Sequence, residues 1–385
     1  MQTPYLDEEH ALLREQVRRF LREEVEPNGE AWERAGEVPR DVLRRMGELG
    51  FLGLRYPEAY GGSDMDARGT AVLAEELGRS TYGGFAITVL VHTDMASPYL
   101  ARAGSPEQRD RWMPGIVSGE TITAVGVTEP GAGSDVASIR TRARMDGNEW
   151  VLNGTKLYIT NGVLADLYIV AARTDPEARG SRGISLFLVE KGTAGFSVAS
   201  RLDKMGWRSS DTAELLFEDC RIPAANLLGE ENRGFYTIMQ GFQNERLALA
   251  AQAVGEASRA IELTLDYVRD RPAFGQPLWR QPVIRNRLAM LAAQVSAARA
   301  FVYETAWRAG RGEEVVREVS MLKALCGELV NRVMYDCQQF HGGFGYMRGT
   351  AIERMVRDAR VQAIGGGATE VMLEEVAKRL DDWSP

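Results

Sequence analysis

Cysteine and histidine are scarce in this chain. Its 385 residues include 3 cysteines and 3 histidines, and it contains neither a CxxC nor an HExxH motif. The residues concerned are His10, His92, His341, Cys220, Cys326 and Cys337. Zinc is usually bound by clusters of these residue types at short spacing, so we expect no metal site. An odd number of widely spaced thiols is typical of reduced cysteines in a cytoplasmic protein rather than of a disulfide framework.

The chain also lacks a surplus of basic residues and a long apolar run. It has 46 Lys and Arg against 54 Asp and Glu, a net charge of −8. Nucleic-acid binding needs a basic face, so this balance argues against that class of function. No run of about 20 apolar residues is present, so no span of a bilayer is expected. The first nine residues lack the basic-then-apolar order of a signal peptide, which again indicates a cytoplasmic protein.

Hydrophobic residues make up 44% of the sequence and charged residues 26%, as in an ordinary globular protein. The length is sufficient for two or three domains. The pattern changes near residues 120 and 230, so we expect domains over 1–120, 121–229 and 230–385.

Segment 1–120 has the helical pattern. Apolar residues recur at spacings of three and four within 7–25 and 41–49. Ser105, Pro106 and Glu107 have the order of an N-cap, a first-turn proline and an acidic first turn, so a helix should follow through Trp112. We therefore predict an all-α N-terminal domain.

Segment 121–229 has short apolar runs separated by turn signals. The dipeptides Asp146-Gly147, Asn153-Gly154 and Asn161-Gly162 can each supply the positive φ of a tight hairpin. Runs such as 157–160 and 167–170 lie between or after them, rich in β-forming residues. The segment predicts an antiparallel, β-barrel-like domain.

Segment 230–385 returns to the helical period, with four apolar stripes. The first runs from Leu247 to Val268 and the second from Ile284 to Val302. The third consists of Val319, Leu322, Cys326, Leu329 and Val333, and the fourth of Leu373, Val376 and Leu380. Four amphipathic helices predict an antiparallel four-helix bundle. The fold class is thus α+β, with the order α, β, α, and not a doubly wound dinucleotide fold.

The stretch Pro130–Asp135 includes Gly131 and Gly133 at the spacing that begins a GxGxxG motif. Val136 stands where the third glycine belongs, and no βαβ unit surrounds it. Taken alone, the stretch is more typical of a tight turn than of a phosphate loop.

Together with 271–275 and 339–345, however, the run 125–135 closely resembles the acyl-CoA dehydrogenase family. The resemblance extends from about residue 50 to the last helix and is closest to long-chain and isovaleryl-type members. It implies the three-domain fold of that family and α,β-desaturation of acyl-CoA thioesters to trans-2-enoyl-CoA. In the family a glutamate removes the Cα proton, FAD takes the Cβ hydride, and electrons pass to an electron-transfer flavoprotein.

The resemblance also assigns cofactor-binding residues. A first flavin segment comprises Val125, Val127, Thr128, Gly133 and Ser134, and a second comprises Tyr158, Ile159 and Thr160. The resemblance implies that the ADP half of FAD is bound across a subunit interface, by Arg271, Phe274, Gln281, Gln339, Phe340, Gly342 and Gly343. It therefore also implies a homotetramer built as a dimer of dimers. Ala368, Thr369 and Glu370 close the cofactor segment. Departures from the family pattern occur at Tyr158, Ala273, Pro282 and Ala368, and without the resemblance Tyr158 would be interpreted as a strand residue in the core.

The catalytic base follows from two positions. A helical glutamate followed by arginine is by default a surface residue. Short- and medium-chain members carry their base at the loop position that is Gly366 here, whereas long-chain and isovaleryl-type members carry it at the position of Glu245. The resemblance therefore implies that Glu245 is the base, with a pKa raised by burial, and that the N–H of Gly366 and a hydroxyl of FAD bind the thioester oxygen.

Substrate contacts are implied for Ser134, Gln243, Arg246 and Gly365, with Gln243 near the pantetheine arm. Two alternatives remain open on the sequence: an acyl-CoA oxidase of the same fold, and a catalytically silent flavin-binding scaffold. Acyl-chain length, branching and the electron acceptor are not determined by the sequence.

Overall fold

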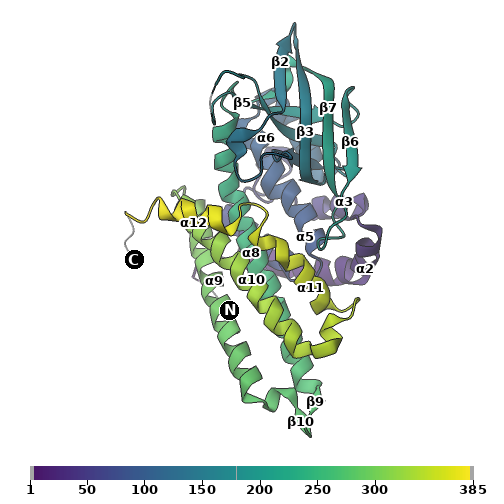
Figure 1. The fold of residues 1–385 in the computed structure, drawn as a ribbon, viewed down its shortest axis with the longest axis vertical. Coiled ribbons are helices and arrows are strands. Elements are labelled where there is room, and N and C mark those ends of the chain that lie inside the picture. Colours follow the sequence, from purple (N-terminus) through teal and green to yellow (C-terminus); the bar gives the residue numbers. More distant parts are fainter. Residues whose placement is uncertain (1–3, 179, 382–385) are drawn as a thin grey trace.

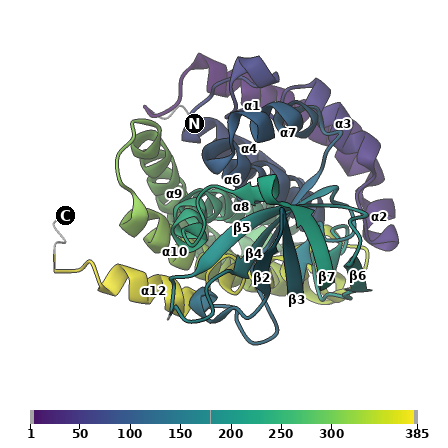
Figure 2. The same cartoon turned by 90° about the horizontal axis from the view of Figure 1, so that it is seen from above.

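The protein has a β-sheet at one end and a bundle of long helices at the other, with further helices packed beside both (Figure 1). This computed structural model describes residues 4–178 and 180–381. Seen along the long axis, the N-terminal helices lie on one side of α8 and the strands on the other (Figure 2). The predicted order of helical, β and helical parts is confirmed. Within the described residues, no helix is long and apolar enough to cross a lipid bilayer.

The N-terminal part contains seven α-helices and two π-helical turns. They are α1 (Glu8–Phe20), a π-turn (Leu21–Val25), α2 (Glu26–Ala35), α3 (Arg40–Glu48), α4 (Ala67–Gly78), α5 (Gly83–Leu90), a second π-turn (Val91–Ala96), α6 (Ser97–Ala103) and α7 (Pro106–Ser118). The predicted start of α7 is confirmed: the N–H of Gln108 donates to Ser105 Oγ at 3.2 Å, and the N–H of Ser105 donates to Gln108 Oε1 at 3.0 Å.

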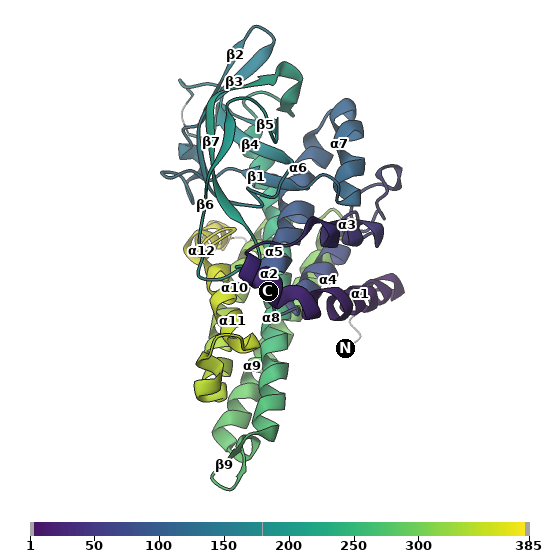
Figure 3. The ribbon, with the colours of Figure 1, turned by 90° about the vertical axis from the view of Figure 1, so that its right-hand side faces the viewer.

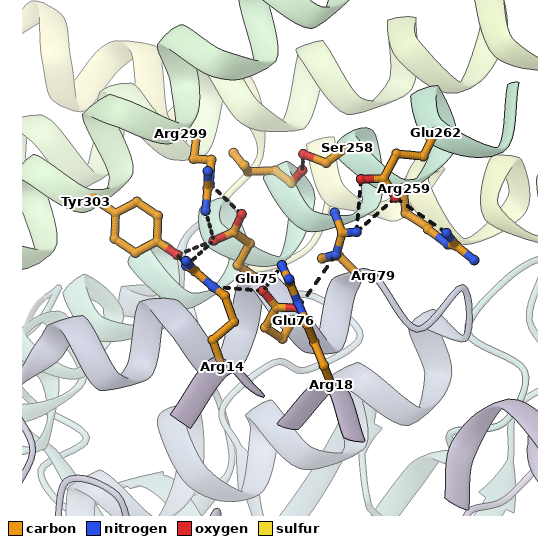
Figure 4. A network of polar contacts seen from close by, with 11 residues as sticks. Arg14, Arg18, Glu75, Glu76, Arg79, Ser258, Arg259, Glu262, Arg299 and Tyr303 are labelled. Atoms are coloured by element: carbon orange, nitrogen blue, oxygen red, sulfur yellow. Dashed lines mark hydrogen bonds and ion pairs between the residues drawn. The ribbon is translucent and has the colours of Figure 1, made fainter. Parts of the chain in front are cut away.

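Helix α4 is buried between α1, α8 and α9, and two adjacent glutamates of α4 carry its only buried charges. Glu75 is bound by Arg14 of α1 at 3.1 Å and by Arg299 of α9 at 2.6 Å, and Glu76 is bound by Arg18 at 2.8 Å. Figure 4 shows these side chains converging from the three helices. Burying a carboxylate is costly unless it is paired, so the network fixes how α1 and α9 pack on α4.

The middle part is one eight-stranded sheet with the order β6-β7-β3-β2-β4-β5-β8, and β1 pairs with β4. The strands are β1 (Thr123–Gly126), β2 (Arg142–Asp146), β3 (Glu149–Thr160), β4 (Leu167–Arg173), β5 (Ile184–Glu190), β6 (Phe196–Arg201), β7 (Thr212–Pro223) and β8 (Leu227–Leu228). Most pairs are antiparallel, but β1 runs parallel to β4. The sheet is therefore mixed, where a wholly antiparallel one was expected.

Two of the three predicted hairpin turns are wrong. Asp146-Gly147 does join the antiparallel pair β2 and β3. Asn153-Gly154 instead lies inside β3, where the pairing with β7 shifts register. Gly154 has φ +149°, and a Cβ there would lie 2.5 Å from Thr141 Oγ1, so the glycine permits close approach rather than a turn. Asn161-Gly162 does form a turn, but the strands it connects, β3 and β4, are separated in the sheet by β2.

The C-terminal part consists of α8 (Gly234–Asp270), α9 (Pro282–Gly310), α10 (Val316–His341), α11 (Ala351–Ala359) and α12 (Thr369–Ala377), with a small hairpin of β9 (Pro272–Ala273) and β10 (Gln276–Pro277) between α8 and α9. Helix α11 was not predicted. Helix α12 carries Leu373 and Val376 of the fourth stripe, and Leu380 lies beyond its end. Helix α8 runs from beside the sheet to the β9–β10 hairpin (Figure 3). It begins at Gly234, so Glu245 lies inside the helix rather than near its start.

Candidate active site

Glu245 faces the loop that precedes α12. Its side chain is half-buried on α8, and a Cβ built on Gly366 would lie 2.9 Å from Glu245 Oε1. Gly366 has φ +65°, in the left-handed region that favours glycine. The structure thus brings together the two positions that the sequence singled out. A side chain at 366 and the carboxylate of Glu245 would compete for one space.

The loop offers a free hydrogen-bond donor at this point. The N–H groups of Ile364 and Gly365 donate to the carbonyl of Val361 at 2.8 and 2.9 Å. The N–H of Gly366, in contrast, donates to no other group in the part of the chain that the structure describes. Gly365 is half-buried, and a Cβ there would make only an ordinary contact, 3.6 Å from Val361 Cγ2.

Burial has the largest effect on the pKa values of Glu245 and Lys323. It raises the pKa of the Glu245 carboxyl to about 7, against the opposing positive charges of Arg246 and Lys323. Burial also lowers the pKa of the Lys323 ammonium to about 8, and Glu245 opposes that change. A carboxyl with a pKa near neutrality is well matched to general-base catalysis.

Arg246 is buried beside Glu245. Its guanidinium lies over the ring of Phe242 at 5.6 Å, and burial lowers its pKa. Its Nε has no hydrogen-bond partner among the described residues. An unpaired buried donor of this kind indicates a place for an acceptor on a ligand. Gln243, on the same helix, is half-buried.

The two predicted flavin segments lie side by side. The N–H of Leu157 in β3 donates to the carbonyl of Thr128 at 2.9 Å. Lys156, fully buried, donates to the carbonyl of Val127 at 3.1 Å and to Glu129 Oε1 at 2.7 Å. Val125 is half-buried on β1, and Val127 is buried. These bonds fix the backbone of the first segment against the second.

Tyr158 is exposed, which corrects its interpretation as a core residue. Its side chain is 67% exposed, and its φ is +62° at a register shift between β3 and β7. The bulge turns the ring outward, whereas Ile159 points into the core and Thr160 is half-buried. Gly133 and Ser134 are exposed as well.

A π-helical turn connects the flavin segments to the helix that carries Glu245. In this turn, Val91–Ala96, Asp94 accepts from Asn244 Nδ2 of α8 at 3.1 Å. His92 Nδ1 lies 3.0 Å from Thr123 Oγ1 of β1. Both elements of the site are therefore attached to one irregular turn, a type of structure that is frequent at functional sites.

The residues predicted to hold the ADP half of FAD form a separate group. Arg271 and Phe274 are exposed beyond the end of α8, and Gln281 is half-buried before α9. At the end of α10, Gln339, Gly342 and Gly343 are exposed and Phe340 is half-buried. The hydroxyl of Tyr267, near the end of α8, donates to the carbonyl of His341 at 3.2 Å, and the rings of Tyr267 and His341 stack. These contacts hold the ends of α8 and α10 together.

This second group is far from Glu245 in the same chain. The 26 residues that separate Glu245 from Arg271 on α8 correspond to about 39 Å of helix at 1.5 Å per residue. The structure does not bring the two groups together within one subunit. Of the remaining predicted residues, Ala368 is half-buried, Glu370 is exposed, and Thr369 is buried with its hydroxyl donating to Glu328 Oε1 at 3.1 Å.

Three family models match the chain: the acyl-CoA dehydrogenase N-terminal domain over residues 7–120, the middle domain over 124–220 and the C-terminal domain over 232–381. The chain belongs to the acyl-CoA dehydrogenase family. It is 44% identical over 373 residues to the long-chain specific acyl-CoA dehydrogenase, mitochondrial, of Rattus norvegicus, a match that covers 97% of this chain and 86% of the relative. It is 38% identical over 369 residues to the isovaleryl-CoA dehydrogenase, mitochondrial, of Pongo abelii, covering 95% and 87%. The solved acyl-CoA dehydrogenase of Geobacillus kaustophilus superposes with a TM-score of 0.96 at 42% identity, covering 99% of this chain and 100% of that one.

These findings confirm the resemblance drawn from the motifs. As a member of the acyl-CoA dehydrogenase family, the chain is an FAD-dependent oxidoreductase that acts on a CH–CH bond of acyl-CoA thioesters. The flavin segments fit such a cofactor. A Cβ on Gly131 or Gly133 would meet nothing within 4 Å, which leaves the backbone open to a ligand. The N–H of Thr128 makes no bond within the described part of the chain, and the exposed Tyr158 stands beside it on β3.

Several residues beside the candidate site were not found from the sequence. They are Lys156, Lys323, Asp94 and His92. Lys323 could have been noticed, because it is a charged residue four positions after Val319 and three before Cys326, on the third apolar stripe. The π-helical turn has no comparable signal in the sequence.

Proposed function

We propose that Glu245 is the general base of this acyl-CoA dehydrogenase. The observation that carries the proposal is that its carboxylate occupies the space beside Gly366, where a base on the loop would otherwise stand. A pKa of about 7, raised by burial, leaves a large fraction of the carboxyl ionised at neutral pH and able to accept a proton.

The reaction is then divided among few groups. Glu245 accepts a proton from Cα of the acyl chain, and negative charge develops on the thioester oxygen. The free N–H of Gly366 donates to that oxygen, and a glycine suffices because only its amide is used. FAD, when bound, supplies the acceptor for the hydride that leaves Cβ. Removal of one proton and one hydride gives the trans-2-enoyl-CoA.

Long or branched acyl-CoA thioesters are the proposed substrates. Gly365 leaves room next to the base, although Leu249 already fills part of the space at Gly366: a Cβ there would lie 2.3 Å from Leu249 Cδ1. The named relatives support the same classes, since one is specific for long chains and the other acts on isovaleryl-CoA. Arg246 and Gln243 are proposed to contact the substrate, together with Ser134.

The purified holoenzyme tests this proposal. Anaerobic bleaching of the flavin would be measured with a series of thioesters from butyryl-CoA to palmitoyl-CoA and with isovaleryl-CoA. Long or branched substrates should bleach the flavin at least as fast as butyryl-CoA. A strict preference for butyryl-CoA would contradict the substrate class, and a flavin that no acyl-CoA bleaches would contradict the proposed activity.

A homotetramer, built as a dimer of dimers, is proposed because the two halves of the cofactor site are separated in one chain. Phe274, in the turn between β9 and β10, is 94% exposed and has φ +53°, and several other apolar side chains of the C-terminal part are exposed. These are Val283, Tyr335, Phe344, Tyr346 and Met347. Such a surface is typical of an interface. Arg271 and Gln339 of one subunit would complete the FAD site of its partner.

Subunit complementation tests this arrangement. Glu245→Gln removes the base, and Arg271→Ala removes a pyrophosphate contact. If Arg271 acts across the interface, a mixed oligomer contains one site with both residues intact, so mixing the two variants restores activity at an FAD concentration too low to load Arg271→Ala. If Arg271 acts within its own subunit, every site lacks one residue and mixing restores nothing.

Electrons are proposed to pass to an electron-transfer flavoprotein in the cytoplasm. The alternative is reaction with oxygen, as in an oxidase of the same fold. Oxygen consumption by the reduced enzyme, compared with reduction of a purified electron-transfer flavoprotein, separates the two acceptors.

A further inference from the structure

Lys323 is a buried lysine on α10 whose ammonium holds the catalytic loop. Its side chain is 2% exposed. Nζ donates to the carbonyl of Gln362 at 2.6 Å and to the carbonyl of Gly367 at 3.1 Å. These two carbonyls lie on opposite sides of Gly366 in the sequence. The ammonium thus fixes the loop before and after the residue with the free N–H.

The same side chain lies close to the base. A Cβ on Gly366 would be 3.7 Å from Lys323 Cε and 2.9 Å from Glu245 Oε1. The buried lysine and the carboxylate of Glu245 therefore border the same space at Gly366. The titratable groups that act on Lys323 are Glu245 and Arg246 of α8 and the thiol of Cys326 on α10.

A structural role alone accounts poorly for a charge in this position. Burying an ammonium is costly, and the two acceptors it contacts are neutral carbonyls. An apolar side chain among Val319, Leu322 and Cys326 would pack the stripe without that cost. The charge is explained if it acts on the chemistry: it favours the ionised form of Glu245 and stabilises negative charge that develops beside Gly366.

The loop also depends on outside support. Gly366 and Gly367 have φ of +65° and +104°, so the backbone between them has wide conformational freedom. Gln362, whose carbonyl Lys323 binds, is anchored on its other side by Nε2, which donates to Glu256 Oε1 of α8 at 3.2 Å. The loop is thereby clamped between α8 and α10.

We infer that Lys323 is a positioning residue for proton abstraction, holding the N–H of Gly366 in place and keeping Glu245 ionised. The inference rests on the proposed function of Glu245 and Gly366. It predicts that loss of the ammonium affects the deprotonation step more than the binding of FAD or of the thioester.

The test uses Lys323→Met and Lys323→Gln in the holoenzyme. Methionine is an apolar replacement of similar length, and glutamine retains a hydrogen-bond donor without the charge. Lys204→Met is the matched control, because Lys204 is a half-buried lysine that likewise donates to a backbone carbonyl, that of Ser210, and to Thr212 Oγ1 at 2.9 Å. Proton abstraction would be followed by exchange of the α-protons of a 3-thiaacyl-CoA with solvent deuterium, which requires no oxidation of the substrate.

We expect Lys323→Met to keep FAD and a KM within a few-fold of the wild type, while kcat and the α-proton exchange fall about 10- to 100-fold, as misplacement by about 1 Å can produce. The pH at which kcat/KM reaches half its plateau should rise, because Glu245 loses a neighbouring positive charge. Lys323→Gln should show the same displacement of the pH profile with a smaller loss of kcat. Lys204→Met should change none of these values.

Unchanged exchange and an unchanged pH profile in both Lys323 variants would overturn the inference. The inference would also be overturned if the variants lost FAD or melted at a lower temperature while their folded fraction exchanged α-protons at the wild-type rate. That result would show that Lys323 has a purely structural role. If Lys323→Met does not fold, Lys323→Gln gives the same two outcomes. A wild-type enzyme that neither exchanges α-protons nor is bleached by any acyl-CoA would instead refute the proposed function itself.

Discussion

Replacing Glu245 by glutamine should inactivate the enzyme and at the same time stabilise it. Burial raises the pKa of this carboxyl to about 7 from an ordinary value of 4.5. The difference corresponds to about 3 kcal/mol at 1.36 kcal/mol per pKa unit, which is the cost of ionising the carboxyl inside the fold. That pKa already includes the favourable influence of Arg246 and Lys323. Glutamine has nearly the same shape and never ionises, so it avoids the cost.

The sign of the pH dependence follows from linkage. Above pH 4.5 the unfolded chain releases the proton of Glu245 while the folded protein still holds it, so the contribution of Glu245 to the stability of the wild type falls as the pH rises. The loss is complete above about pH 7. Glu245→Gln and the wild type should therefore have similar stability near pH 4.5, and at pH 8 the variant should be more stable by up to about 3 kcal/mol.

The assay combines melting temperature and flavin bleaching across this pH range. The variant should keep FAD, melt several degrees higher than the wild type at pH 8, and lose about 10² to 10⁴ in bleaching rate as a general base is removed. Glu15→Gln, at an exposed position on α1, is the control and should change stability by no more than about 0.5 kcal/mol. Wild-type bleaching rates in Glu245→Gln would show that the base lies elsewhere. Equal melting temperatures at pH 8 would show that ionising Glu245 costs little in the folded protein.

Three further predictions concern the same elements. In the wild type, kcat/KM should rise with pH through about 7 as Glu245 loses its proton, which steady-state rates between pH 5.5 and pH 8 would show; a flat profile would contradict this. Adding Gly366→Glu to Glu245→Gln should restore little activity, because the new side chain would collide with Leu249 and position 366 has a left-handed φ that favours glycine. Adding Leu249→Ala as a third substitution should raise the recovered bleaching rate. Arg271→Ala should weaken FAD binding about 10- to 100-fold by loss of a charge-assisted hydrogen bond, measured by equilibrium dialysis, whereas Arg269→Ala, two residues earlier on the same helix end, should not.

The order of the three parts could be predicted from the sequence because each part has its own hydrophobic period. Local turn chemistry was a weaker guide. Asn153-Gly154 has the composition of a hairpin turn, yet the cross-strand pairing of β3 with β7 extends through it. The glycine is used there for close approach to Thr141. A dipeptide cannot reveal which of these two uses of glycine applies, because the difference depends on strands distant in the sequence.

The two central residues of the candidate site were predictable for a different reason. Glu245 and Gly366 were selected as a pair, by comparing what related sequences carry at each position, and the structure places them in contact distance of each other. Arg271 and Gln339 were also selected by resemblance, but no sequence pattern could show how far from Glu245 they lie. That distance became visible only with the length of α8.

Lys156 and Lys323 occupy comparable places beside the two halves of the candidate site. Each is a buried ammonium that binds backbone carbonyls of a loop: Val127 for Lys156, and Gln362 and Gly367 for Lys323. In a trans peptide the C=O of one residue and the N–H of the next point in opposite directions. When Lys156 binds the carbonyl of Val127, the N–H of Thr128 must therefore point away from it.

Lys323 acts in a different way, because the carbonyls that it binds, those of Gln362 and Gly367, do not belong to the peptide that carries the N–H of Gly366. It holds the loop on both sides of that residue, and the N–H of Gly366 makes no bond within the described part of the chain. A carboxylate in the place of Lys323 would bind N–H groups of the loop instead and would repel a developing oxyanion. An ammonium that binds carbonyls therefore has the polarity that removal of a proton from a thioester requires.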